Sequence, residues 1–394
     1  MNGGRHLLLR WAVGAAVVAC AGTVIPGWWC GREAHDLYRG DLAPQDALAR
    51  SVIAWVDRGL AASDFRTGSA RFNGEWLFGA YQMASLGLMQ VARQHPEKRA
   101  DYLPAAERCL DRLLSAEVRA FDAEAWRHFG GDALETLDTD AGHAAYLGYL
   151  NVALGVHRLL VPDSRFAVWN DRITEALARR ISRSPTHFLQ TYPGETYPVD
   201  NAAVAASIML HGQATGADHR AALGPWLESF RRVALDPETG LLRQAVHWRD
   251  GRATDLPRAS GTALACYFLG LARHELSGDL YTALRRQCFT SWLGFGLVRE
   301  YARGEGRSRA DIDSGPVLLG IGFSATGFSL AGARLHGDPD RFRALYRTAY
   351  AVGAPLDRDG RRDFVCGGPL GNALLLALLT APRAAPLPQE GEPP

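Results

Sequence analysis

The stretch LFGAYQMASLGLMQVA, residues 77 to 92, is apolar on almost every side of the helix that its spacing predicts. A helix of this kind is buried all round. PVLLGIGFSATGFSLAGA at 316–333 has the same character, whereas SRFAVWNDRITEALARRI at 164–181 has one apolar and one charged face. Fully buried helices beside amphipathic ones are expected in two concentric rings. The sequence therefore predicts an all-α fold, an (α/α)6 toroid.

Helical periodicity also dominates the rest of the chain, and no convincing strand alternation appears. Pro96, VPDSRF at 161–166 and HGDPDRF at 336–342 mark helix boundaries. The pattern predicts about twelve helices arranged as six hairpins, near residues 44–61, 76–95, 103–117, 141–160, 165–182, 201–215, 219–234, 260–276, 278–294, 316–335, 338–352 and 368–380. The toroid domain would span 42–382, and the Pro-rich tail at 383–394 is expected to be disordered.

The first thirty residues form a separate segment. Arg5 and Arg10 precede an uncharged, mostly apolar run at 11–29, and a membrane span needs roughly 17–25 residues. Segment 1–30 is therefore predicted to be a signal or an inner-membrane anchor, with the body outside the cytoplasm in the cell envelope. The alternative is a lipoprotein, because VVAC at 17–20 is similar to a lipoprotein cleavage site with Cys20 as the lipidated residue.

Composition and motifs narrow the classes of function. The 43 basic and 42 acidic residues nearly cancel, which argues against a nucleic-acid partner. The cysteines show no C-x-x-C spacing, the histidines are scattered, and no phosphate loop or G-x-S-x-G motif occurs. We therefore expect no metal and no cofactor. A Cys266–Cys288 disulfide and an oligomer both remain open.

TYPGETYPVDN, residues 191–201, carries the leading catalytic candidates, Glu195 and Asp200. Asp200 has a plain structural role as a helix N-cap, but a carboxylate at the mouth of a toroid could also act as a base. Glu195 lies between Tyr192 and Tyr197, where partial burial would favour a proton donor. Otherwise it is a solvated loop charge.

Four further stretches, at 72–81, 134–146, 253–265 and 307–327, lead into predicted inner helices and supply more candidates. RSRADIDSG at 307–315 places two carboxylates before an apolar helix, and the second, Asp313, is the third catalytic candidate. The other loops add titratable and aromatic groups that could contact a substrate, although a Glu or Asp there could equally serve as a helix cap. The predicted binding residues are Glu75, Trp76, Asp138, Asp140, His143, Tyr149, Tyr192, Tyr197, Arg258 and Asp311.

The segment beginning YLGYLNVALGVHRLL at 146 and continuing through YPVDNAAVAASIML at 197–210 resembles the bacterial linalool dehydratase/isomerase family over about residues 135–245. The resemblance implies an (α/α)6 barrel and the interconversion of myrcene, linalool and geraniol. That family uses a His in a GHLN context and two Cys. Here Tyr149 replaces the His, and Thr191 and Asp200 occupy the matching Cys places. We therefore expect a changed reaction and no turnover of the three terpenoids.

Three functions follow from these observations. The first is a carbohydrate-active enzyme, a glycoside hydrolase that uses paired carboxylates on an oligosaccharide. The second is a dehydratase, isomerase or lyase that acts on a terpene alcohol or another hydroxylated substrate. The third is a non-catalytic binding toroid. An open acidic cleft would favour the first, an apolar cavity with few carboxylates the second, and mouth carboxylates neutralised by arginine the third.

Overall fold

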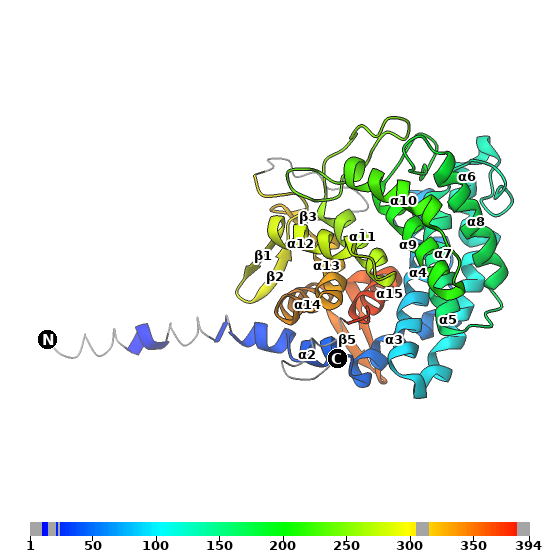
Figure 1. The fold of residues 1–394 in the computed structure, drawn as a ribbon. Helices are drawn as coiled ribbons and strands as arrows, with labels where there is room; N and C mark the ends of the chain where they lie inside the picture. The colour runs from blue at the N-terminus through cyan, green and yellow to red at the C-terminus, as the bar shows by residue number, and fades with distance from the viewer. Residues whose placement is uncertain (1–9, 15–20, 23, 305–314, 384–394) are drawn as a thin grey trace, which may run out of the picture.

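The computed structural model describes residues 10–14, 21–22, 24–304 and 315–383. Its centre is a ring of helices, each of which contacts the next, and the last contacts the first (Figure 1). The members of this ring are α4 (Ala70–Gln94), α7 (Ala144–Leu160), α9 (Pro198–Thr215), α11 (Ala259–Leu271), α13 (Phe323–Leu335) and α15 (Gly368–Leu379). The predicted helical toroid is thus confirmed as an arrangement of helices around a closed inner ring.

A second set of helices packs outside this ring. These are α3 (Leu42–Arg58), α5 (Arg99–Leu114), α8 (Ala167–Arg183), α10 (Arg220–Ser229), α12 (Leu276–Gln287) and α14 (Pro339–Gly353). Helix α5 packs on α4, α8 on α7 and α9, α10 on α8, α12 on α11, α14 on α13, and α3 on α15 and α4. The short helices α2 (Ala34–Arg39) and α6 (Ala116–Ala125) contact α14 and α4.

The burial of the helices explains why the sequence separates into two rings. Every residue from Tyr81 to Ala92 of α4 is buried, whereas α8 buries one face that includes Ile173, Leu177 and Ile181. Inner neighbours also approach closely. A Cβ atom at Gly87 would lie 2.6 Å from the Leu376 Cγ and 2.9 Å from the Ala377 backbone nitrogen. A larger residue at position 87 would therefore push α15 away from α4.

Three two-stranded antiparallel pairs interrupt the helical pattern. They are β1 (Phe289–Trp292) with β2 (Phe295–Val298), β3 (Val317–Leu318) with β4 (Ile321–Gly322), and β5 (Pro355–Arg358) with β6 (Arg361–Phe364). The helices predicted at 278–294 and 316–335 were therefore too long. α12 ends at Gln287, and α13 begins at Phe323.

Each hairpin turns through two residues, Leu293-Gly294, Leu319-Gly320 or Asp359-Gly360, and all six of these residues have a positive φ. This is the backbone of the turn whose twist suits a two-residue hairpin. The remaining elements are the 3₁₀ turns Ala62–Asp64, Pro96–Lys98, Arg127–Phe129 and Val365–Gly367, and the π-helical turn Phe230–Ala234 that extends α10.

The two ends of the chain lie partly or wholly outside the described residues. Of the predicted anchor, residues 1–9, 15–20 (with Cys20) and 23 are not described, and of the predicted tail only Arg383 is. No helix in the described part of the chain combines the length and hydropathy that a bilayer crossing requires. Membrane attachment stays a prediction, which cell fractionation tests. Cys266 and Cys288 are free buried thiols, so the disulfide considered above is not formed.

The stability of the toroid should fall in mild acid, in part because of His157. Burial lowers the pKa of His157 below its ordinary 6.5, although Glu107 opposes the shift. The unfolded chain then binds this proton more readily, so the stability contributed by neutral His157 is present above about pH 6.5 and is lost as the pH falls. We expect the melting temperature to drop between pH 7.5 and 5.5, and to drop less in His157→Gln. Equal drops in both proteins would contradict this assignment.

Candidate active site

The first turns of all six inner helices surround one cavity of about 730 Å³. Each helix contributes side chains to its wall, for example Glu75 from α4, Tyr149 from α7, Asp200 from α9, Leu264 from α11, Phe328 from α13 and Leu370 from α15. Enclosed cavities of roughly 300–1,000 Å³ are typical of small-molecule sites. This cavity is therefore the candidate active site.

Asp200 is the most firmly held carboxylate in the cavity. It lies in the first turn of α9 and is 7% exposed. The Tyr149 hydroxyl donates to its Oδ1 at 2.8 Å, and the Thr191 hydroxyl donates to its Oδ2 at 2.7 Å. Two donors aimed at one carboxylate favour its charged form. The predicted N-cap role is wrong, since the N-cap residue of α9 is Tyr197.

Glu195 lies across a tight turn from Thr191 and is much more accessible. The backbone nitrogen of Thr191 donates to the Glu195 carbonyl at 2.8 Å. The Glu195 side chain is 44% exposed, and its Oε2 accepts a 2.8 Å bond from the Tyr197 hydroxyl. The Arg71 guanidinium is 3.9 Å away. The two leading carboxylates therefore share one cavity wall but differ sharply in their exposure to solvent.

Tyr192 belongs to the same cavity wall as Glu195 and Asp200, and its hydroxyl is buried. The Arg71 guanidinium lies 3.7 Å from the centre of its ring. Burial raises the pKa of the Tyr192 hydroxyl well above its ordinary value, and the negative charges of Glu75 and Asp200 act in the same direction. The Tyr192 hydroxyl is therefore neutral at physiological pH, has no hydrogen-bond partner among the described residues, and feels the charges of both Glu75 and Asp200.

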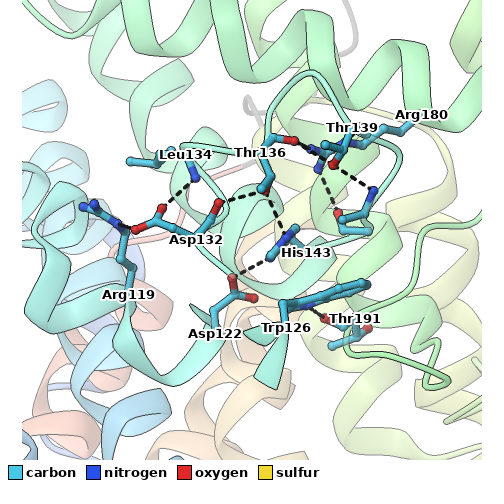
Figure 2. Close-up of polar contacts among 12 residues, drawn as sticks. Arg119, Asp122, Trp126, Asp132, Leu134, Thr136, Thr139, His143, Arg180 and Thr191 are labelled. Atoms are coloured by element: carbon cyan, nitrogen blue, oxygen red, sulfur yellow. Dashed lines mark hydrogen bonds and ion pairs between the residues drawn. The ribbon is translucent and has the colours of Figure 1, made fainter. Parts of the chain in front are cut away.

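A buried ion pair lies behind this wall (Figure 2). The Nδ1 of His143 donates to Asp122 Oδ2 at 2.6 Å, and both side chains are inaccessible to solvent. Burial raises the pKa of Asp122, and the bond from His143 opposes that rise. The other nitrogen of His143 lies 3.4 Å from the Thr136 hydroxyl. The pair is therefore a structural support and is not exposed to a substrate.

Trp126 connects the pair of His143 and Asp122 to the cavity wall that holds Thr191 and Asp200. Its ring lies 4.5 Å from the imidazole of His143, and its Nε1 donates to the Thr191 carbonyl at 3.3 Å (Figure 2). Arg180 fixes the loop above, because its guanidinium donates to the carbonyls of Thr136 and Gly142 at 2.7 and 3.2 Å. Thr191, which holds Asp200, is thereby attached to a buried and rigid layer.

The structure places seven of the predicted site residues around the cavity and leaves others elsewhere. The seven that line it are Glu75, Trp76, Tyr149, Tyr192, Glu195, Tyr197 and Asp200. Asp311 and Asp313 lie outside the described residues. The other four, Asp138, Asp140, His143 and Arg258, do not line this cavity.

The physical reason differs among these four residues. Asp138 and Asp140 are exposed, and Asp140 accepts a 3.1 Å bond from Arg183. The imidazole of His143 is fully buried and bonded to Asp122, so it does not face the cavity. Arg258 is buried before α11 and donates to Asp255 at 2.6 Å. Loop position alone did not distinguish side chains that face the cavity from those that fasten the loop.

Several residues of the site went unrecognised in the sequence. Arg71 lines the cavity, and Asp122 anchors the layer behind it. Gln82 also lines the cavity, and its Nε2 is buried without a hydrogen-bond partner in the part of the chain that the structure describes. The available signal for Gln82 was a polar amide within the apolar run at 77–92, a feature that Gln90 shares. Asp122 offered no such signal, because it lies in an ordinary amphipathic helix.

A shallower hollow of about 590 Å³ adjoins the site. Pro193 and Gly194 line it, together with Trp126, Phe129 and Asp140. The turn at 191–195 therefore separates the two hollows, with the carboxylates on the inner side. Nowhere in the described ranges do three or more metal-ligating side chains gather.

The sequence matches no model of a known protein family. The structure is similar to a family 105 glycoside hydrolase from C. acetobutylicum ATCC 824, with 12% identity, a TM-score of 0.54, and coverage of 86% of this chain and 98% of that chain. The fold is shared. It is also similar to an inactive variant of the α-1,6-mannanase GH76A from Salegentibacter sp. HEL1_6 in complex with α-1,6-mannotriose, at 13% identity, a TM-score of 0.51 and the same coverage. At sequence identities this low, the two comparisons show that the fold is similar and show nothing about function.

Proposed function

We propose that this chain is a carbohydrate-active enzyme, a glycoside hydrolase on an (α/α)6 toroid, with its catalytic carboxylates in the 730 Å³ cavity. One observation carries the proposal. Glu195 and Asp200 share a cavity wall in contrasting environments, one half-exposed and one buried beneath two hydroxyl donors. Carboxylates in such different surroundings can divide the roles of acid and base. The shared fold of two glycoside hydrolases supports the same class.

Each carboxylate has a role that follows from its contacts. Asp200, kept ionised by Tyr149 and Thr191, takes a proton from water as that water attacks the anomeric carbon. Glu195, within reach of solvent, gives its proton to the leaving oxygen as the glycosidic C–O bond breaks. Direct attack by water inverts the anomeric centre and goes with about 6.5–9.5 Å between the two carboxyl groups; at about 5–5.5 Å, Asp200 would instead attack the anomeric carbon itself, and water would then release the sugar from Asp200 with retention. Asp313 stays a predicted third candidate.

A second function is favoured by one specific observation. Tyr149, Thr191 and Asp200 are the positions that match the His and the two Cys of the linalool dehydratase/isomerase family, and they are joined here by two hydrogen bonds. A dehydratase or isomerase that acts on another hydroxylated substrate could use these same three side chains. The groups have changed from imidazole and thiols to hydroxyls and a carboxylate, so the family's own substrates are not expected to react.

The test is turnover by the purified full chain. α- and β-linked manno-, gluco- and galacto-oligosaccharides, and alkyl glycosides of the same sugars, are incubated with the protein, and new reducing ends are measured. Linalool, geraniol and myrcene are followed separately by gas chromatography. We expect release of reducing ends from at least one glycoside, either an oligosaccharide or an alkyl glycoside of the same sugars, and no change in the terpenoids. Conversion of a terpenoid without any glycoside cleavage would replace the first function by the second.

A further inference from the structure

The cavity has two chemically different halves. Its described charged side chains, Arg71, Glu75, Glu195 and Asp200, all come from α4, α9 and the turn before α9. The opposite wall is built by the first turns of α13 and α15. Among the described residues, its large side chains are Phe328, Leu370 and Leu374, and its polar groups are the Ser324 hydroxyl and the Cys366 thiol.

Tyr149 marks the boundary between these halves. Its hydroxyl donates to Asp200 on the charged side. Its ring packs edge-on against Phe268 of α11, with ring centres 4.9 Å apart at 89°. Leu264, one turn before Phe268, continues the apolar surface toward α13. A ligand whose reacting carbon is beside Asp200 therefore extends directly onto aromatic and aliphatic side chains.

The described side chains suit a sugar ring in the first half and an apolar group in the second. Each ring carries several hydroxyls, and a buried hydroxyl without a partner weakens binding. The α13 and α15 wall offers too few described partners to satisfy a second ring. An alkyl or aryl group gains affinity there instead, by about fourfold for each methylene group that is removed from water.

We infer that the substrate is an amphipathic glycoside, in which the sugar lies at Asp200 and Glu195 and an apolar aglycone lies against α11, α13 and α15. This inference rests on the proposed glycosidase function and names the substrate class of the same cavity. In this arrangement the leaving group is the aglycone, which lies in the apolar half of the cavity. The proton from Glu195 then goes to the glycosidic oxygen at the boundary between the two halves.

The test compares ligands that differ only in the length of the aglycone. Methyl, butyl and octyl β-D-glucosides and α-D-mannosides are titrated below their micelle concentrations into the full chain carrying Asp200→Asn, whose turnover is expected to be about 10²–10⁴-fold slower. Isothermal calorimetry gives each Kd. We expect the octyl glycoside of the preferred sugar to bind at least about 50-fold more tightly than the methyl glycoside, because several methylenes become buried. Affinities within twofold of each other would overturn the inference.

Two variants locate the effect in the apolar half. Leu374→Asn places an amide on the α15 wall and should weaken octyl glycoside binding at least tenfold while leaving methyl glycoside binding unchanged. Val168→Asn is the matched control, since Val168 is 66% exposed on the outer surface, and it should change neither affinity. Equal effects of the two variants would show that the alkyl chain binds elsewhere, and would overturn the inference. Circular dichroism verifies that both variants are folded.

A separate arm with 1-octanol distinguishes failure of the proposed function from failure of the inference. Octanol that binds as tightly as octyl glycoside means that the sugar contributes nothing, which overturns the glycosidase proposal. Dependence on both the sugar and the chain length supports the function and the inference together. Dependence on the sugar alone retains the function and overturns the amphipathic substrate.

Discussion

Asp200→Asn is expected to lower turnover by about 10²–10⁴-fold, the usual loss when a proton-transfer group is removed. The amide keeps the shape of the carboxylate, and the hydroxyls of Tyr149 and Thr191 can rotate to serve it. The melting temperature should therefore change little. Turnover is measured on whichever oligosaccharide or glycoside the wild-type protein cleaves, together with a thermal melt of the same preparation.

The matched control is Asp140→Asn. Asp140 was also a sequence candidate, but it is exposed, pairs with Arg183 and lies outside the catalytic cavity. The same chemical change there should leave turnover within about twofold of wild type, since exposed ion pairs contribute little. Glu195→Gln should behave like Asp200→Asn if Glu195 is the acid. Wild-type turnover in both Asp200→Asn and Glu195→Gln would remove the assignment of the two carboxylates.

His143→Ala should lower the free energy of unfolding by about 3–5 kcal/mol, the usual result of leaving one member of a buried pair without the other. Without His143, the Asp122 carboxyl loses its hydrogen-bond donor in a site with no access to water, where it must either hold an unpaired charge or take up a proton, and both cost stability. Position 143 also has a φ of 50°, a backbone region that alanine adopts less readily than asparagine does. Urea unfolding, followed by circular dichroism, measures the loss.

Two further variants separate the buried charge from the other effects. Asparagine at position 143 tolerates the positive φ and carries a donor close to the place of Nδ1, so His143→Asn should be much milder than His143→Ala. Adding Asp122→Asn to His143→Ala removes the unpaired charge and should restore part of the lost stability. A double variant no more stable than His143→Ala would mean that charge burial is not the cause.

The ring of helices could be predicted from the sequence because its signal is periodic and local. The apolar run at 77–92 belongs to a helix buried on every side, and the structure shows α4 in that position. Glu195 and Asp200 were predicted to face the barrel mouth because they precede a predicted inner helix, and Tyr149 was predicted from the family resemblance; all three line the cavity. The inner helices begin around the cavity, so a carboxylate at the start of such a helix lies close to it.

The rest depended on contacts between distant parts of the chain. Whether His143 faces the cavity or the core is decided by Asp122, 21 residues earlier. Strand β1 was predicted as the end of a helix because PheThrSerTrp at 289–292 is short and apolar enough to continue the periodicity of α12, whereas β2 fell in a predicted loop. The Asp359-Gly360 turn was a visible hairpin signal, but the stretch between the predicted helices 338–352 and 368–380 was not predicted to form strands.

The closing contact of the inner ring has a consequence for how the protein forms. Gln90 of α4 donates to the Ala377 carbonyl of α15, a residue 287 positions later. Contacts of such large sequence separation form slowly, and long chains fold through intermediates that expose apolar surface. During synthesis, the face of α4 that packs on α15 stays uncovered until almost the whole chain has been made. The toroid therefore depends on its last helix for closure, and a chain truncated before Gly368 should expose that face and aggregate.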